Sequence, residues 1–132
     1  MPSKNKLNKI VSNINALPEF LRSKALSTFF GKMVKFTGTA GIIIEELNEQ
    51  KAVISLKNKK AVQNHIGSVH AVASILIAES ASGYVVGMNI PDTSVPVIKT
   101  IKADYTGTRL STSSKEHVKV SLESEEYQAV LS

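Results

Sequence analysis

The chain has 132 residues, of which 42% are hydrophobic, with no cysteine and a formal net charge of +5. This length suits one compact domain with its own hydrophobic core and is too short for two. The absence of cysteine excludes disulfides, thiolate metal ligands and a cysteine nucleophile. The lysine clusters around Lys6 and Lys59 lack the aromatic residues that stack on bases, so no binding to nucleic acid is expected.

The N-terminal segment is rich in lysine but is not followed by an apolar stretch and a small-residue cleavage site, so no signal peptide is expected. The longest apolar stretch, residues 69–78, falls short of the roughly 20 residues that span a bilayer. We therefore expect a cytoplasmic protein without a membrane span.

Two helices are predicted at the N-terminus, as a flank over residues 1–35. The first is amphipathic and ends near Pro18, because apolar residues recur there at three- and four-residue spacing. Pro18 suits the first position of the second helix, which should end before Gly31. The buried stripe of the second helix is predicted to consist of Phe20, Leu21, Leu26, Phe29 and Phe30.

From Thr39 the pattern changes to strands, which predicts a core domain over residues 36–132. An isoleucine run at residues 42–44 and an alternating segment at 52–56 flank a polar turn at 48–50, which predicts a hairpin. Segment 64–86 has small and aliphatic residues on every side, which predicts a helix buried all round. Further strands are predicted at residues 84–90, 95–105, 110–114, 117–122 and 127–131.

This order of elements predicts a single α+β domain over residues 1–132, in which an antiparallel sheet wraps around a long central helix. One sheet covers only part of such a helix. A second copy of the chain should cover the remaining side and the sheet edge, which predicts a homodimer or a homotetramer.

Glu79 is the candidate for chemistry within the predicted central helix. Its neighbours one turn away carry no positive charge. Because burying an unpaired carboxylate costs free energy, Glu79 should meet a partner from another segment or subunit, or act as a general base. Membership of a purely structural hydrogen-bond network stays open as an alternative.

Polar and small residues gather where this helix is predicted to begin: Asn64, His65, Gly67, Ser68 and His70. Backbone N–H groups at a helix start can bind an oxyanion or a carbonyl, and Gly67 allows a ligand to approach the backbone. Two structural alternatives stay open, with Ser68 as the helix N-cap and His70 as a capping or packing residue.

Other catalytic classes find no support in the sequence. The histidines lack the spacing of a metal site, so no metal is expected. No G-x-S-x-G motif surrounds a serine, and no glycine-rich phosphate loop is present, so neither a serine hydrolase nor nucleotide chemistry is expected.

The run from Asn64 to Gly83 resembles the central-helix signature of hot-dog-fold acyl-CoA thioesterases, above all the phenylacetate-pathway subfamily, and looks close to an uncharacterised thioesterase-like branch. The matching positions are Asn64, Gly67, His70, Glu79 and Gly83. The Gly-Gly pair that usually follows the histidine is Ala71-Val72 here, which narrows access to the backbone. The acid is Glu where the family more often has Asp.

The resemblance implies a hot-dog fold and hydrolysis of an acyl-CoA or a similar acyl thioester. Glu79 would act as base or nucleophile, and the backbone N–H of Ala71 would polarise the thioester carbonyl. His70 and Asn64 would orient substrate or water. In the family these groups face each other across a dimer interface.

Further substrate contacts are expected at Gly67, Ser68 and Gly83. Lys57, Lys59 and Lys60 are candidates to meet the phosphates of coenzyme A, which would be part of the substrate, with no separate cofactor. The alternative function is a non-catalytic hot-dog module that binds an acyl chain or another apolar ligand.

Overall fold

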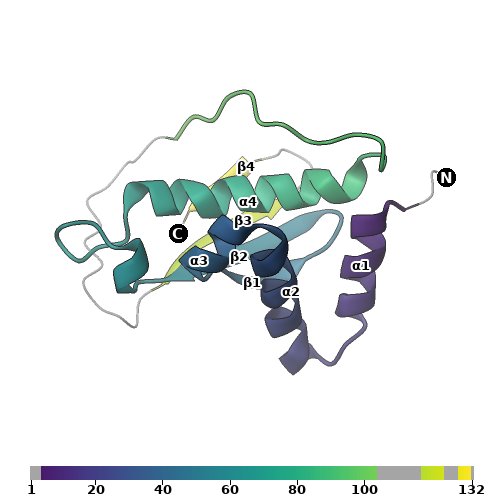
Figure 1. Cartoon of the computed structure of the whole chain (residues 1–132), viewed down its shortest axis with the longest axis horizontal. Coiled ribbons are helices and arrows are strands. Elements are labelled where there is room, and N and C mark those ends of the chain that lie inside the picture. Colours follow the sequence, from purple (N-terminus) through teal and green to yellow (C-terminus); the bar gives the residue numbers. More distant parts are fainter. Residues whose placement is uncertain (1–3, 104–116, 124–127, 132) are drawn as a thin grey trace.

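The computed structural model describes residues 4–103, 117–123 and 128–131, and it has a mixed α+β fold (Figure 1). In chain order the helices and strands are α1 (Lys6–Asn15), α2 (Glu19–Met33), α3 (Lys35–Ala40), β1 (Ile43–Leu47), β2 (Lys51–Lys57), the 3-10 turn η1 (Lys60–Val62), α4 (Ala71–Asn89), β3 (His117–Glu123) and β4 (Gln128–Leu131).

The strands form one antiparallel sheet in the order β1-β2-β3-β4. The predicted hairpin is confirmed, with Ile54 of β2 lying between Ile44 of β1 and Val120 of β3. Asn48 shapes the turn, because its Oδ1 accepts hydrogen bonds from the backbone N–H groups of Gln50 and Lys51 at 2.8 and 2.9 Å. Asn in a turn commonly satisfies the backbone in this way.

The hydrophobic core lies between this sheet and α4, which contacts β2, β3 and β4 (Figure 1). From β2, the alternating residues Ala52, Ile54 and Leu56 are fully buried, as the period-two pattern predicts. They share one core with Ile77 and Val85 of α4. Helix α2 packs on β1, and α1 contacts both α2 and α4, so the N-terminal flank completes the helical layer.

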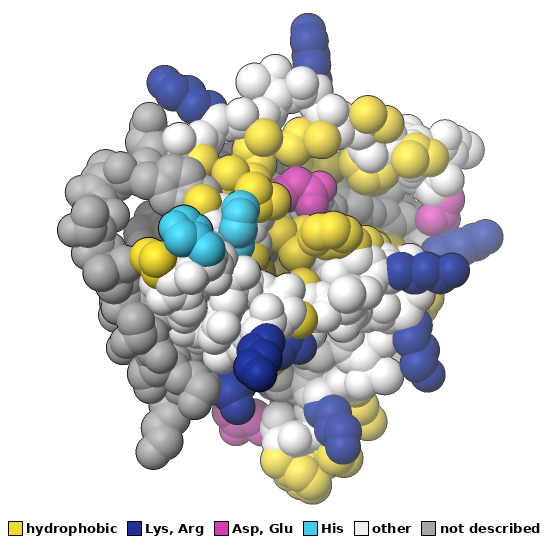
Figure 2. Space-filling view, turned by 60° about the vertical axis from the view of Figure 1, so that its left-hand side comes forward, with side chains coloured by type: hydrophobic (Ala, Val, Ile, Leu, Met, Phe, Trp, Pro, Cys, Tyr) yellow, Lys and Arg dark blue, Asp and Glu magenta, His cyan; other side chains and the backbone are white. Residues whose placement is uncertain are grey.

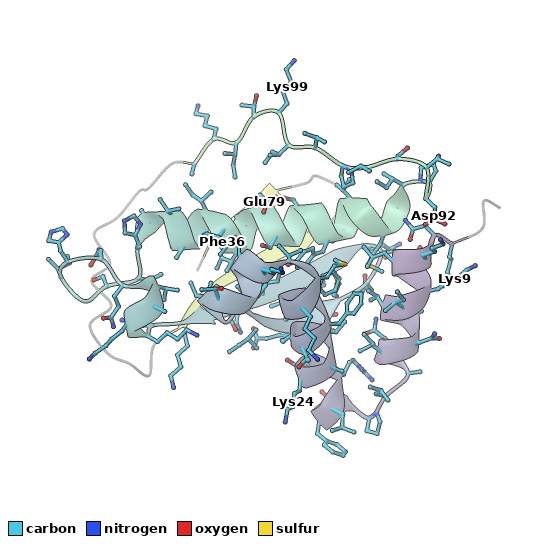
Figure 3. The ribbon with its side chains drawn as sticks, viewed as in Figure 1. Lys9, Lys24, Phe36, Glu79, Asp92 and Lys99 are labelled. Atoms are coloured by element: carbon cyan, nitrogen blue, oxygen red, sulfur yellow. The ribbon has the colours of Figure 1, made fainter. Side chains whose placement is uncertain are left out.

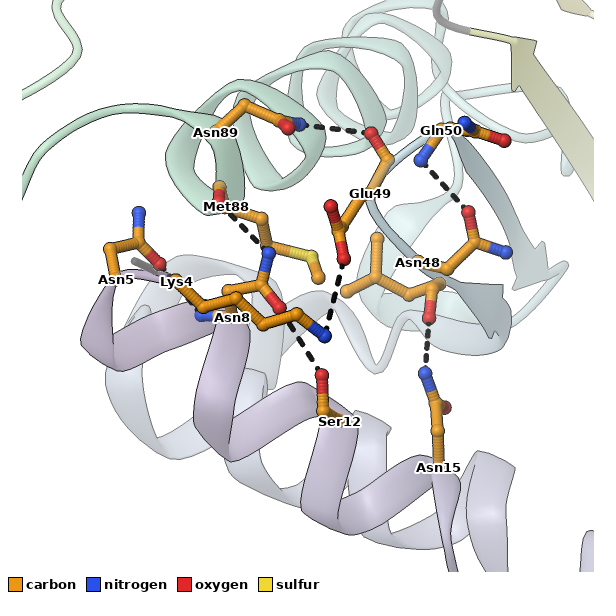
Figure 4. A network of polar contacts seen from close by, with 11 residues as sticks. Lys4, Asn5, Asn8, Ser12, Asn15, Asn48, Glu49, Gln50, Met88 and Asn89 are labelled. Carbon is orange, nitrogen blue, oxygen red and sulfur yellow. Dashed lines mark hydrogen bonds and ion pairs between the residues drawn. The ribbon is translucent and has the colours of Figure 1, made fainter. Parts of the chain in front are cut away.

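Helix α4 differs from its prediction at both ends. It begins at Ala71, because residues 64–69 form a turn, and it continues to Asn89 through residues that were predicted as a strand. The extra turns are stabilised by α1, since side chains from that helix reach the last carbonyl groups of α4. Asn5, the N-cap of α1, donates from Nδ2 to the Gly87 and Ile90 oxygens at 2.7 and 2.6 Å. Asn8 Nδ2 donates to Met88 O at 3.2 Å, as Figure 4 shows.

Four other expectations are corrected. The second helix passes Gly31 and ends at Met33, and the unpredicted helix α3 follows it, so the first strand begins at Ile43 rather than near Thr39. Residues 95–103 form no strand. Of the predicted stripe on α2, Leu26 and Phe30 are buried, whereas Phe20 is 80% exposed.

In the described chain α4 is buried on one side only, which corrects the expectation of burial all round. Val72 is 57% exposed, and the segment after α4 carries Val95 and Val97 exposed by more than four-fifths. By length and apolar composition alone, the 19-residue helix α4 could also cross a membrane. The apolar stretch that the sequence showed was shorter than this helix. In this structure the same helix packs on the sheet.

Candidate active site

Glu79 lies near the middle of α4, half-buried, at the wall of a cavity of about 500 Å³ (Figure 3). The cavity is lined by α1, the end of α2 and α4, together with the segment that follows α4. Among the described residues, none gives the Glu79 carboxylate a hydrogen bond or an ion pair. The expected lack of a local partner is therefore confirmed for this part of the chain.

Ser80 and Tyr84 line the same cavity from α4. The Tyr84 ring stacks on Phe30 at a centroid distance of 4.1 Å, and its hydroxyl donates a long 3.5 Å hydrogen bond to Thr37 Oγ1. Ser80 is 2% exposed, and although its hydroxyl lies near the Tyr84 phenol, it makes no hydrogen bond of good geometry with a described residue.

Burial raises the pKa of the Tyr84 phenol above the ordinary tyrosine value, and the negative charge of Glu79 adds to this shift. The Thr37 and Ser80 hydroxyls oppose the shift because they stabilise the phenolate. The folded protein thus holds this proton more tightly than the unfolded chain does. The resulting stability is present below the ordinary tyrosine pKa and is lost as pH rises through the raised value.

Spectroscopic titration of Tyr84 is expected to show this shift. As pH is raised, the phenolate absorbance near 295 nm should show one step at a higher pH than an unperturbed tyrosine gives. Tyr84→Phe should remove that high-pH step. Retention of the high-pH step in the variant would assign it to another tyrosine and would contradict the proposed burial effect.

The turn before α4 is organised by Asn64. Its Oδ1 accepts from the N–H groups of Ile66 and Ser68 at 3.0 and 3.1 Å, so this oxygen already serves the turn. Gly67 has a φ of +79°, and nothing lies within 4 Å of a Cβ built there, so the positive φ is what favours glycine here. The buried Asn58 supports the turn by donating to Gly67 O at 3.1 Å.

His70 is the N-cap of α4, because its Nδ1 accepts from the N–H of Val72 at 3.0 Å. The capping alternative is therefore confirmed for His70, while the N-cap assignment of Ser68 is wrong. Ser68 is buried in the turn, and its hydroxyl has no hydrogen-bond partner among the described residues. Ala71, the first residue of the helix, is exposed.

A single chain does not bring these groups together around one carbonyl. Glu79 lies eight residues after Ala71 on the same helix, which separates them by about 12 Å of helix rise. The lysines of the predicted phosphate site lie elsewhere too. Lys57 ends β2, Lys59 covers Gly41 and Lys60 begins η1, and the cavity instead has Lys6 in its wall.

Figure 2 shows hydrophobic side chains gathered around an acidic side chain on one face, beside histidine side chains, with the Lys and Arg side chains outside this group. Among the described residues, the exposed large hydrophobic side chains include Phe36 on α3, Ile66 in the turn before α4 and Val72 on α4. A grouped apolar patch of this kind is typical of a surface that is covered by another molecule.

Asn58, Ser80 and Tyr84 were not among the predicted site residues. Ser80 lies inside the predicted helix without a feature that marks it, and Tyr84 lies where the predicted helix 64–86 and the predicted strand 84–90 overlap. The cavity depends on α1, which lies more than 60 residues before Glu79 in the sequence, so no local pattern around Glu79 indicates the cavity. For Asn58, the one usable signal is a polar residue at the end of a buried strand.

The fold is similar to that of a solved protein, the genomics target APC5556, which is known from a crystal structure. The two agree with a TM-score of 0.67 over 95% of this chain and 83% of the other, at 18% sequence identity. At that identity the likeness shows the fold alone. No curated protein matches the sequence. Residues 22–128 match the family described as Domain of unknown function (DUF4442), and since this span covers most of the sequence, the chain belongs to the DUF4442 family.

Proposed function

We propose that this protein has a hot-dog fold and hydrolyses acyl thioesters, with acyl-CoA as the substrate class. The antiparallel sheet packed on one long helix supports the fold. One observation carries the reaction: Glu79 lies in the wall of a mainly apolar cavity, and no described residue pairs with its carboxylate. A carboxylate in such a place has its lone pairs available to take a proton from water.

In the proposed reaction, Glu79 accepts a proton from a water molecule as that water attacks the thioester carbonyl carbon. The tetrahedral intermediate then collapses, the carbon–sulfur bond breaks, and the leaving sulfur takes the proton that Glu79 had accepted, which returns Glu79 to its carboxylate form. Charge that develops on the carbonyl oxygen requires a hydrogen-bond donor close to it. The start of α4 is the proposed place for this oxygen, because the positive end of the helix dipole lies there.

We propose a homodimer or homotetramer because Glu79 and its own helix start are too far apart to act on one carbonyl. A second copy packed on the exposed side of α4 would bring the helix start of one subunit to Glu79 of the other. The exposed Val72, Val95 and Val97 support this arrangement, since each would be removed from water. Lys57, Lys59 and Lys60 remain candidates for the coenzyme A phosphates outside the cavity.

The test is thiol release from a panel of acyl-CoAs by the wild type and by Glu79→Gln. The variant keeps the size of the side chain and removes its basicity, so we expect kcat to fall by about 100-fold. Glu19→Gln is the matched control, because Glu19 is exposed on α2 and lies outside the cavity; its rate should stay within about twofold of wild type.

Equal rates for the wild type and Glu79→Gln would remove Glu79 from the mechanism. If the wild type releases no thiol from any chain length, the second proposal holds, that of a non-catalytic module for an apolar ligand. The cavity itself favours this second function, since it needs no reacting group to bind an acyl chain.

A further inference from the structure

The cavity beside Glu79 has a wall that is largely hydrocarbon, and this wall does not include the residues at the start of α4. Leu7 and Ile10 from α1 face Phe29 and Met33 from α2, and its volume of about 500 Å³ is in the range of small-molecule sites. A wall of this composition suits a hydrocarbon chain and does not suit a phosphate, whose charge would lose its hydration there.

The opposite wall, on α4, carries polar groups that have no well-formed hydrogen bond to a described residue. Ser80 is only 2% exposed, and its hydroxyl makes no hydrogen bond of good geometry with a described residue. The Glu79 carboxylate one residue earlier is unpaired as well. A buried hydroxyl without a partner is destabilising, and a ligand atom that accepts its proton would remove that cost. Because Glu79 is acidic, an uncharged carbonyl fits this wall better than a second carboxylate.

The N-terminal helix is fixed as part of the site. Asn5 bonds two carbonyl oxygens near the end of α4, and the backbone N–H of Lys6 donates to Asp92 Oδ1 at 2.9 Å. These contacts hold α1 against both α4 and the segment after it, so that Leu7 and Ile10 have a set position in the wall.

We propose that this cavity binds the acyl chain of the ligand, with the carbonyl beside Ser80 and Glu79 and the chain between α1 and α2. The choice of an acyl group rests on the proposed function. The new element is that the N-terminal helices, rather than the sheet, form the wall that selects the chain. Lys6 is the one cation in the described cavity wall, so the nucleotide part of coenzyme A stays outside.

Gly83→Leu tests the site. A Cβ at Gly83 would have Glu79 Oε1 at 3.8 Å as its nearest neighbour, so a leucine there extends into the open cavity. Leucine also has a higher helix propensity than glycine, so α4 should form without loss. Binding of decanamide, an uncharged acyl probe, is measured by calorimetry on the full chain. We expect Gly83→Leu to weaken binding by at least about tenfold, whereas the control Phe20→Ala, an exposed position on α2 outside the cavity wall, should keep it within about threefold.

The outcomes separate this proposal from the proposed function. Wild-type binding of decanamide that Gly83→Leu leaves unchanged would overturn the cavity assignment, and so would no binding to the wild type. If the chain releases no thiol but binds decanamide in a Gly83-dependent way, only the enzymatic function fails. If thioesters from butyryl to myristoyl are hydrolysed with the same KM pattern in Gly83→Leu and wild type, only the acyl-chain proposal fails.

Discussion

Replacing Phe30 by alanine is expected to lower the free energy of unfolding by about 4 kcal/mol, the usual cost of removing a buried phenyl ring. Phe30 is fully buried, and its ring stacks on Tyr84 and meets Phe29 edge-on at 5.0 Å. The ring therefore joins α2 to the cavity side of α4. Urea unfolding followed by circular dichroism measures the change, with the midpoint expected to fall and the slope to stay constant.

Phe20→Ala is the matched control for this change. Phe20 lies on the same helix, but it is 80% exposed, so its removal should alter the free energy of unfolding by less than about 0.5 kcal/mol. The sequence pattern placed both residues in one buried stripe. Similar losses for the two variants would support that stripe and would contradict the packing of α2 described here.

The hairpin could be predicted because its signals are local. Alternating apolar residues in β2 leave one face for the core, and the polar residues between the strands include Asn48, whose side chain shapes the turn. The first helix could be predicted for the same reason, since its apolar spacing fits a helix packed on one side. In each case the chain within about ten residues contains the information.

The bounds of α4 could not be predicted in this way. Its residues are apolar on every side, so no period marks where it begins or ends, and the valines near Tyr84 also suit a strand. What extends the helix to Asn89 is long-range: Asn5 and Asn8 from α1 satisfy its last carbonyl groups. Caps from another helix are absent from any local window.

In the candidate site, too, local features could be predicted from the sequence and long-range ones could not. That Glu79 has no cation one turn away could be seen in the sequence, because this is a local property. The local reading also suggested that His70 caps the helix, and the structure agrees. The cavity and the unused hydroxyl of Ser80 could not be identified, since both depend on α1 and α2 packing against α4.

Gly38→Ala is expected to reduce the free energy of unfolding by about 3 kcal/mol, as overpacking against backbone atoms does. A Cβ at Gly38 would lie 3.1 Å from the carbonyl carbon and 3.3 Å from the Cα of Gly31, and closer still to the Gly31 oxygen. Because these are backbone atoms, no side-chain rotation relieves the contact, and α3 must move away from α2.

Gly83→Ala makes the same chemical change in α4, but it should raise the free energy of unfolding instead of lowering it. The added methyl group meets only an ordinary 3.8 Å contact, so the higher helix propensity of alanine should stabilise the protein by up to about 1 kcal/mol. Thermal unfolding of both variants tests the pair. An unchanged Tm for Gly38→Ala would mean that α2 and α3 do not approach at this glycine. Their close packing also explains why Gly31, predicted to end a helix, lies inside one.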